Sequence, residues 1–263
     1  MFALNRKYFL ALRIIFLSIL FLSPLSIMAI VNMDGLHFDQ KENTSSAALE
    51  LTASGSSGNQ NSTKTSLNGQ YNWIENKAIN LAVVGYQYGE NNNVRNINKA
   101  FFHYRYIFQM NETLDLEIFG QIEKNEFTRL SYRGLVGSGV RYAIAKSNEH
   151  RGFLGLGGFY SSEKTEVTAG LTDDGVENFA RANFYLLSKY KINSTLNLSN
   201  VIYYQPRLSD VSDYRALFES KLDFKIVKNL SLRLSLDVEH DSQPSQTIKS
   251  TDVSYMTGLA FKF

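Results

Sequence analysis

Charged side chains recur at even spacings in several segments of this sequence. Arg129, Arg133 and Arg141 are separated by four and then eight positions, and Asp115 and Glu117 by two. On a β-strand, residues an even number of positions apart lie on the same face. Ten residues of this kind are candidates for a shared polar surface: Arg105, Asp115, Glu117, Arg129, Arg133, Arg141, Arg181, Arg215, Glu219 and Arg233.

Such a surface can do two kinds of chemistry. Carboxylates and guanidinium groups on neighbouring strands can neutralise each other as ion pairs, as a closed interior requires, because a desolvated charge needs a partner. The same groups can instead line a water-filled passage, where the strip of Arg129, Arg133 and Arg141 beside Arg105 would favour anions. Both signs of charge are well represented, so the spacing alone leaves both interpretations open.

Residues suited to catalysis or metal binding are sparse. The four histidines, His37, His103, His150 and His240, are too scattered for a metal-ligand motif. His240 and Asp241 could form a carboxylate-oriented base at the predicted outer rim, but acidic residues are ordinary in solvated external loops. We therefore predict no catalytic residue, no metal site and no cofactor, and we predict that the protein is not an enzyme.

The glycines at 152, 155, 157 and 158 could suggest a nucleotide-binding loop. Their order lacks the Gly-x-Gly-x-x-Gly spacing, and no helix is expected after them. We predict instead that they allow a strand to bend or a neighbouring backbone to approach closely.

The overall composition excludes several classes of protein. The formal net charge is +2, and the excess comes from the first 29 residues, so the rest of the chain is nearly balanced. This balance argues against a nucleic-acid-binding protein. With no cysteine in the sequence, a disulfide framework, a thiolate metal site and a thiol nucleophile are excluded.

The segments that carry the charged residues have the residue pattern of β-strands. Residues 230–239 alternate apolar and polar without a fault, which puts all their apolar side chains on one face of a strand and scatters them around a helix. We predict twelve strands, at 46–54, 64–74, 78–88, 97–109, 114–124, 127–145, 152–167, 176–192, 196–206, 214–227, 230–241 and 249–263.

The number and connection of these strands predict an all-β, transmembrane, antiparallel up-and-down β-barrel. The count is even, as in bacterial single-chain outer-membrane barrels, and short connections tend to alternate with longer or more polar ones at 55–63, 89–96, 168–175 and 207–213. A soluble secreted β-sandwich or lipocalin-like barrel is the alternative, since it would also alternate, with its apolar face inward.

The amino-terminal residues have the order of a secretory signal peptide. Basic Arg6, Lys7 and Arg13 precede an apolar run at 14–22, a break at Pro24 and the small residue Ala29. We predict a cleaved signal peptide at 1–29, a periplasmic lead-in at 30–45 and an outer-membrane barrel domain at 46–263. An uncleaved anchor over residues 14–31 is the alternative.

Aromatic residues mark the expected membrane interface. Trp73, Tyr142, Tyr190 and Phe224 fall near the same end of their strands, where amphipathic rings favour the headgroup level. The last strand ends in an aromatic pattern like the signal that outer-membrane proteins present to the barrel-assembly machinery. The residues of this expected assembly signal are Tyr255, Leu259, Phe261 and Phe263.

Three motifs carry a family resemblance: FFHYRYIF at 101–108, NEFTRL at 125–130 and GFLGLGGFY at 152–160. They resemble the salt-induced outer-membrane proteins of the YdiY-like family, catalogued as domain of unknown function 481. The likeness covers most of the chain after the leader. It implies an outer-membrane barrel of a Gram-negative bacterium and transfers no catalytic residue, and the salt-induced label concerns expression.

Together these observations predict an outer-membrane barrel, with a narrow small-solute or anion channel as one function. The alternatives are a closed structural or surface-interaction barrel and, less favoured, a hydrolase acting at the rim. The expected partners are outer-membrane lipid and, during biogenesis, periplasmic chaperones and the barrel-assembly machinery. A small solute is a further candidate partner, and nucleic acid is not expected.

Overall fold

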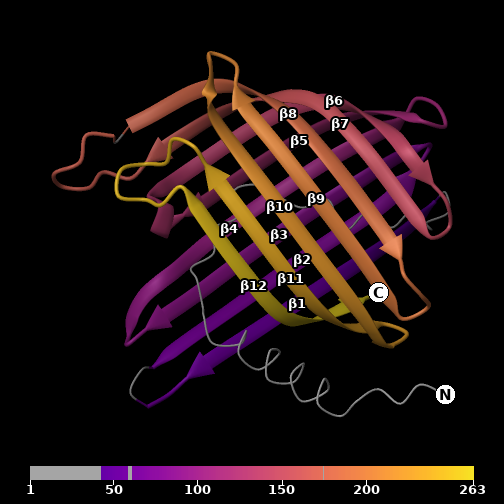
Figure 1. Ribbon diagram of the computed structural model, residues 1–263, viewed down its shortest axis with the longest axis horizontal. Helices are drawn as coiled ribbons and strands as arrows, with labels where there is room; N and C mark the ends of the chain where they lie inside the picture. Colours follow the sequence, from indigo (N-terminus) through magenta and orange to yellow (C-terminus); the bar gives the residue numbers. More distant parts are fainter. Residues whose placement is uncertain (1–42, 59–60, 174) are drawn as a thin grey trace, which may run out of the picture.

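The computed structural model describes residues 43–58, 61–173 and 175–263, which form a closed β-barrel (Figure 1). Each strand pairs antiparallel with its neighbours in sequence, and β1 pairs with β12 to close the barrel. The strands are β1 (Thr44–Ser56), β2 (Ser62–Glu75), β3 (Ala78–Asn91), β4 (Val94–Gln109), β5 (Leu114–Asn125), β6 (Leu130–Lys146), β7 (His150–Thr165), β8 (Gly175–Lys191), β9 (Leu196–Arg207), β10 (Asp210–Val227), β11 (Leu230–Asp241) and β12 (Thr251–Lys262), with a short 3₁₀ helix, η2 (Glu126–Thr128), between β5 and β6.

The period-two pattern of the sequence determines which side chains face the lumen. In β5, Asp115 and Glu117 are buried, whereas Leu116, Ile118 and Ile122 on the opposite face are 38%, 49% and 55% exposed. Exposed apolar residues on the outside and buried charges on the inside are the reverse of a soluble barrel. The predicted fold class is therefore confirmed, and the soluble sandwich is excluded.

The two ends of the barrel differ in their connections. At one end, here called the short-turn end, lie the connections 76–77, 110–113, 147–149, 192–195 and 228–229. At the other, the loop end, lie 57–61, 92–93, 126–129, 166–174, 208–209 and 242–250. Chain closure occurs at the short-turn end, where the backbone N–H of Phe263 donates to the carbonyl of Ala47 over 2.9 Å.

Two of the connections expected to be long are tight turns. Asn91 pairs with Val94, leaving only Asn92 and Asn93 at φ 50° and 63°, the left-handed conformation that a type I′ hairpin turn requires. Asparagine tolerates this conformation, so two residues are enough to make the turn. The rest of the polar run at 89–96 therefore belongs to the ends of β3 and β4. Likewise, Arg207 pairs with Asp210, followed by a register shift before Tyr214.

The twelve predicted strands are all present, with ends that differ by a few residues. Strand β1 begins at Thr44, two residues inside the stretch expected as a lead-in. The predicted signal peptide and residues 30–42 lie outside the described residues. Within the described ranges, no helix is long and apolar enough to cross a membrane.

The outer face carries the residues expected at the membrane. Tyr142, Tyr190 and Phe224 are exposed at the short-turn end of β6, β8 and β10. Tyr255 and Leu259 of β12 and Phe263 directly after it are exposed, and Phe261 is half-buried on the same face. The predicted assembly signal therefore forms one outward-facing row.

Part of the interior is apolar, which our sequence analysis did not predict. Eleven buried residues, here called the inner apolar cluster, extend from β3 and β4 across to β8, β9 and β10: Leu81, Val83, Phe101, Ile107, Ala143, Phe153, Tyr185, Leu187, Val201, Tyr203 and Leu217. Leu81 and Val83 lie within a run of apolar residues, 81–84, where alternation fails. Such a continuous run is the signal of a strand that is apolar on both faces.

Glycines bring β6 and β7 into close contact. Gly139 and Gly157 are register partners, and a Cβ atom on Gly157 would lie 2.3 Å from the carbonyl oxygen of Ser138. The predicted role of the glycine-rich segment in close backbone packing thus agrees with this geometry.

Candidate functional site

The lumen contains a cavity toward each end of the barrel. The loop-end cavity has a volume of about 530 Å³ and reaches inward to Glu123, Phe179 and Glu239. The short-turn cavity has a volume of about 420 Å³ and reaches inward to Phe101 and Asp237. These volumes lie within the range of small-molecule pockets.

The two cavities are separated by a thin layer of side chains. Phe101, which lines the short-turn cavity, is the register partner of Glu123, which lines the loop-end cavity. Asp237 and Glu239, successive inward positions of β11, also line different cavities. Register partners in an antiparallel pair lie only about 5 Å apart at Cα, so the layer is one inward-facing residue thick at this side of the lumen.

Lys99 of β4 lies in this separating layer. It is the next inward residue after Phe101, is only 2% exposed, and lines neither cavity. Among the described residues, its Nζ atom has no hydrogen-bond acceptor. The acidic groups that act on its charge come from both cavities: Glu239 and Glu123 on one side and Asp237 on the other.

An ion-pair network fills the loop-end half of the lumen. Arg133 contacts Glu123 and also Glu163, with Nε 2.8 Å from Oε1 of Glu163. Arg215 reaches the same Glu163 over 2.7 Å and Asp241 over 2.9 Å. The network therefore joins β5, β6 and β7 to β10 and β11 and crosses the lumen.

A second buried pair lies beside this network. The Nη2 atom of Arg181 is 2.6 Å from Oδ1 of Asp213, and its Nη1 donates to the carbonyl of Gln205 over 3.1 Å. The guanidinium of Arg181 also lies over the ring of Phe179, with its Cζ 4.9 Å from the ring centroid. Packing and pairing together account for a guanidinium in this closed site.

Two arginines of the short-turn half, Arg105 and Arg141, are also paired. Arg105 Nη1 lies 3.0 Å from Oε2 of Glu117, which also accepts a 2.8 Å hydrogen bond from the Tyr185 hydroxyl of β8. Arg141 Nε lies 2.7 Å from Oδ2 of Asp115. Strands β5 and β8 are not neighbours, so the bond from Tyr185 to Glu117 crosses the lumen.

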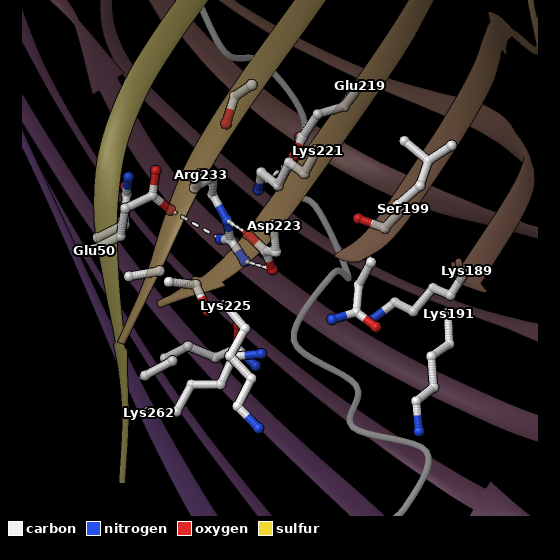
Figure 2. Close-up of a pocket in the computed structure, with 18 of the residues that line it drawn as sticks. Glu50, Lys189, Lys191, Ser199, Glu219, Lys221, Asp223, Lys225, Arg233 and Lys262 are labelled. Carbon is white, nitrogen blue, oxygen red and sulfur yellow. Dashed lines mark hydrogen bonds and ion pairs between the residues drawn. The ribbon is translucent and has the colours of Figure 1, made fainter. Parts of the chain in front are cut away.

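Arg233 and Glu219 line the short-turn cavity. Arg233 contacts Asp223 over 2.7 and 2.8 Å and Glu50 over 3.0 Å, which joins β10, β11 and β1 (Figure 2). Lys221 lies 2.5 Å from Glu219. These acidic groups are therefore neutralised within the cavity wall.

Arg129 lies at the loop-end rim, away from the other candidate arginines. Its Nη1 is 2.7 Å from Oδ1 of Asp173 and 3.2 Å from the carbonyl of Gln246, and its Nη2 is 2.9 Å from the carbonyl of Glu166. The side chain thus ties together three connections of the loop end, 126–129, 166–174 and 242–250. We call this cluster of Arg129, Asp173 and Gln246 the loop latch.

The loop latch affects the protonation of Asp173. Partial burial raises its pKa, but the hydrogen bonds from the Arg129 guanidinium and the Gln246 backbone N–H outweigh this effect. The pKa of Asp173 consequently lies below its usual 3.8.

The expected basic strip of Arg105, Arg129, Arg133 and Arg141 is therefore not an uncompensated surface. Three of these residues face carboxylates inside the barrel, and Arg129 holds the loops. Arg133 binds Glu163 through both Nε and Nη2, a two-contact pairing that the planar fork of arginine suits.

His240 and Asp241 do not contact each other's functional atoms. His240 Nδ1 lies 2.8 Å from the hydroxyl of Thr251, whereas Asp241 faces inward and pairs with Arg215. Adjacent residues of a strand point to opposite faces, which separates the two side chains.

Residues 49–263 match a family described as protein of unknown function, DUF481. The chain belongs to the DUF481 family. The family predicted from the three sequence motifs is thereby confirmed. The comparison with curated proteins gave no match.

Two solved structures share the fold of this DUF481 chain. The NanC porin is 11% identical, with a TM-score of 0.52 over 83% of this chain and 100% of that one. The translocator domain of the autotransporter NalP from Neisseria meningitidis is 11% identical, with a TM-score of 0.52 over 88% of this chain and 91% of that one. At this level of identity the likeness shows the fold alone, that of an outer-membrane β-barrel.

The sequence analysis of this DUF481 chain missed Lys99, Tyr185 and the inner apolar cluster. Lys99 follows the same parity as His103 and Arg105 on β4, so its inward position was readable. The hydrogen bond of the Tyr185 hydroxyl could not be predicted from the sequence, because its partner Glu117 lies on a strand three positions away around the barrel.

Proposed function

We propose that this protein is a narrow conduit for small hydrophilic solutes across the outer membrane, closed in the observed conformation by the layer that contains Lys99. The observation that carries the proposal is the pair of lumenal cavities that approach each other at Phe101 and Glu123. A barrel with a purely structural role has no need for two polar cavities separated by one layer.

The position of Lys99 supports its role as the closing element. Its ammonium group sits on a flexible four-carbon stem, and it is attracted by Glu239 and Glu123 toward one cavity and by Asp237 toward the other. Because no acceptor holds Nζ in the described structure, a change of rotamer does not require breaking a hydrogen bond.

The proposal includes the orientation and surroundings of the barrel. It puts the short-turn end in the periplasm, since outer-membrane barrels have short periplasmic turns. Lipid would surround the exposed apolar band, and a signal peptide and the barrel-assembly machinery would deliver the chain. It involves no cofactor and no catalytic step.

Single-channel recording in planar bilayers tests the proposal. We expect the wild-type barrel to give small, infrequent current steps, and Lys99→Ala to raise the mean current about tenfold, the change for a barrier lowered by about 1.4 kcal/mol. Lys124→Ala is the matched control, because Lys124 is exposed on the outer face one register step from Lys99 and should leave the current unchanged.

The result that would overturn the conduit is silence from both the wild-type and the Lys99→Ala barrels, each shown to be folded by its heat-modifiable mobility. An equal effect of Lys124→Ala would instead show that Lys99 has no particular role in closure.

A closed barrel that presents its loops to a partner is the second candidate. The loop latch favours it, because Arg129 holds three connections in one arrangement at the rim. This candidate predicts no current from any variant and loss of a surface interaction when residues 166–174 are replaced by a short turn.

A further inference from the structure

We propose that the short-turn cavity binds a soluble ligand that carries two or more phosphate or carboxylate groups. Four lysines at its mouth would hold the ligand: Lys191, Lys225, Lys228 and Lys262. In Figure 2, Lys225 and Lys262 lie on one side of the cavity and Lys191 lies on the other. Binding does not require the layer at Lys99 to open, so this inference is independent of conduction.

The fold brings these lysines together from separate strands. Lys191 ends β8, Lys225 lies near the end of β10, and Lys262 ends β12. Lys225 has the same parity as the buried Glu219 and Asp223, which places it on the lumenal face. A lipid headgroup outside the barrel does not reach that face, so the ligand is a soluble anion.

The four lysines lack acidic partners in the described part of the chain. No Asp or Glu side chain there lies within ion-pairing distance of any of them. Three of the five acidic groups that line this cavity are already engaged, Asp223 and Glu50 by Arg233 and Glu219 by Lys221. The lysines are therefore free to neutralise an incoming anion.

The two cavities carry opposite charge. Eight basic and five acidic side chains of the described residues line the short-turn cavity, whereas four basic and eight acidic ones line the loop-end cavity. A concave site lined mainly by one sign of charge concentrates ions of the opposite sign. A multivalent anion is thus attracted to the short-turn end and repelled from the loop end.

The residue type also fits a soluble anion. Lumenal arginines such as Arg141 and Arg233 are committed to carboxylates of the wall, whereas the four mouth residues are lysines, each a hydrated point charge with three donors on a flexible stem. Several such groups can adjust to oxygens at different spacings, which favours a polyanion over a single carboxylate.

Calorimetric titration of the folded wild-type protein in uncharged micelles at low ionic strength tests the inference, with inorganic pyrophosphate and citrate as separate probes. We expect saturable binding of at least one probe, and about tenfold weaker binding by the double variant Lys225→Gln, Lys262→Gln, because two exposed ion pairs are lost. The stronger probe identifies phosphate or carboxylate as the preferred group. Added salt should weaken binding.

Two lysine variants serve as controls. Lys77→Gln removes a charge from a turn at the same end outside the cavity, and Lys249→Gln removes one from the loop-end cavity. Both should bind the probes as the wild type does. The inference is overturned if neither probe binds saturably to the folded wild type, or if Lys77→Gln weakens binding as much as the double variant.

Discussion

Arg215 of β10 and Glu163 of β7 form a two-pronged ion pair across the lumen. Nη1 of Arg215 lies 2.7 Å from Oε1 of Glu163, and Nη2 lies 3.0 Å from Oε2. Strands β7 and β10 are separated by β8 and β9 around the wall, so the pair connects two strands that are not neighbours in the sheet. Arg133 approaches the same carboxylate from β6, which makes Glu163 the centre of the loop-end network.

Loss of Arg215 should destabilise the barrel. We expect Arg215→Met to lower the free energy of unfolding by about 3 kcal/mol, because removal of one partner leaves a buried charge poorly compensated. Adding Glu163→Gln should recover part of this loss. Urea unfolding in micelles, followed by the fluorescence of Trp73, the single tryptophan, measures both effects.

Arg95→Met is the control for this measurement. Its ion pair with Glu126 is largely exposed, with side chains 49% and 34% accessible, so its removal should cost less than about 1 kcal/mol. Equal destabilisation by the two arginine variants would contradict the assignment of a buried network.

Close packing of β6 against β7 predicts that Gly157 does not tolerate a side chain. A Cβ atom there meets the Ser138 carbonyl oxygen at 2.3 Å, and backbone cannot rotate away as a side chain can. Gly157→Ala should cost about 2 kcal/mol of unfolding free energy. Gly120→Ala, whose nearest contact is 3.6 Å, should be tolerated, and a harmless Gly157→Ala would show that β6 and β7 pack less closely than described.

The loop latch should open in acid. The pKa of Asp173 is lower in the folded protein than its usual 3.8, so its contribution is complete above pH 3.8 and is lost as pH falls through the lower folded value. The reporter is the Gln246 backbone N–H, which donates to Asp173 Oδ2 over 2.6 Å. Its hydrogen-exchange protection, corrected for intrinsic rates, should fall below pH 3.8 in the wild type.

In Asp173→Asn the protection of the Gln246 amide should already be low near neutral pH and should no longer depend on acid. Protection that is unaffected by both acid and this substitution would show that the latch does not hold the loop.

The outward row of β12 predicts a role in assembly. Phe263→Ala should reduce the heat-modifiable fraction of protein recovered from outer membranes, while refolding of the purified variant in micelles should match the wild type. The backbone bonds of Phe263 to Ala47 remain in the variant, so a loss seen only in cells points to recognition. Phe224→Ala, which changes an exposed aromatic residue at the same end, is the control. An equal loss of heat-modifiable protein in this variant would show that Phe263 has no special role in assembly.

Much of the fold follows from local pattern. The alternation in residues 230–239 assigns every side chain of β11 to one face, because the side-chain period of a strand is two. The same rule places Asp115, Glu117 and the other candidate charges of the strands inside, but it does not place Arg129, which lies in a connection. The turns were harder to predict, since an asparagine pair such as Asn92–Asn93 can end a hairpin or belong to a longer loop.

The sequence by itself determined the family, the strands and the face on which the charged residues of the strands lie, because these depend on motifs and on a period of two. Only the tertiary structure decided which charges meet. Arg215 pairs with Glu163, and the Tyr185 hydroxyl donates to Glu117, because the closure and diameter of the barrel bring these side chains together. The same closure produces two cavities of opposite charge separated at Lys99, because pairing across the lumen depends on distances between strands that are remote in the chain.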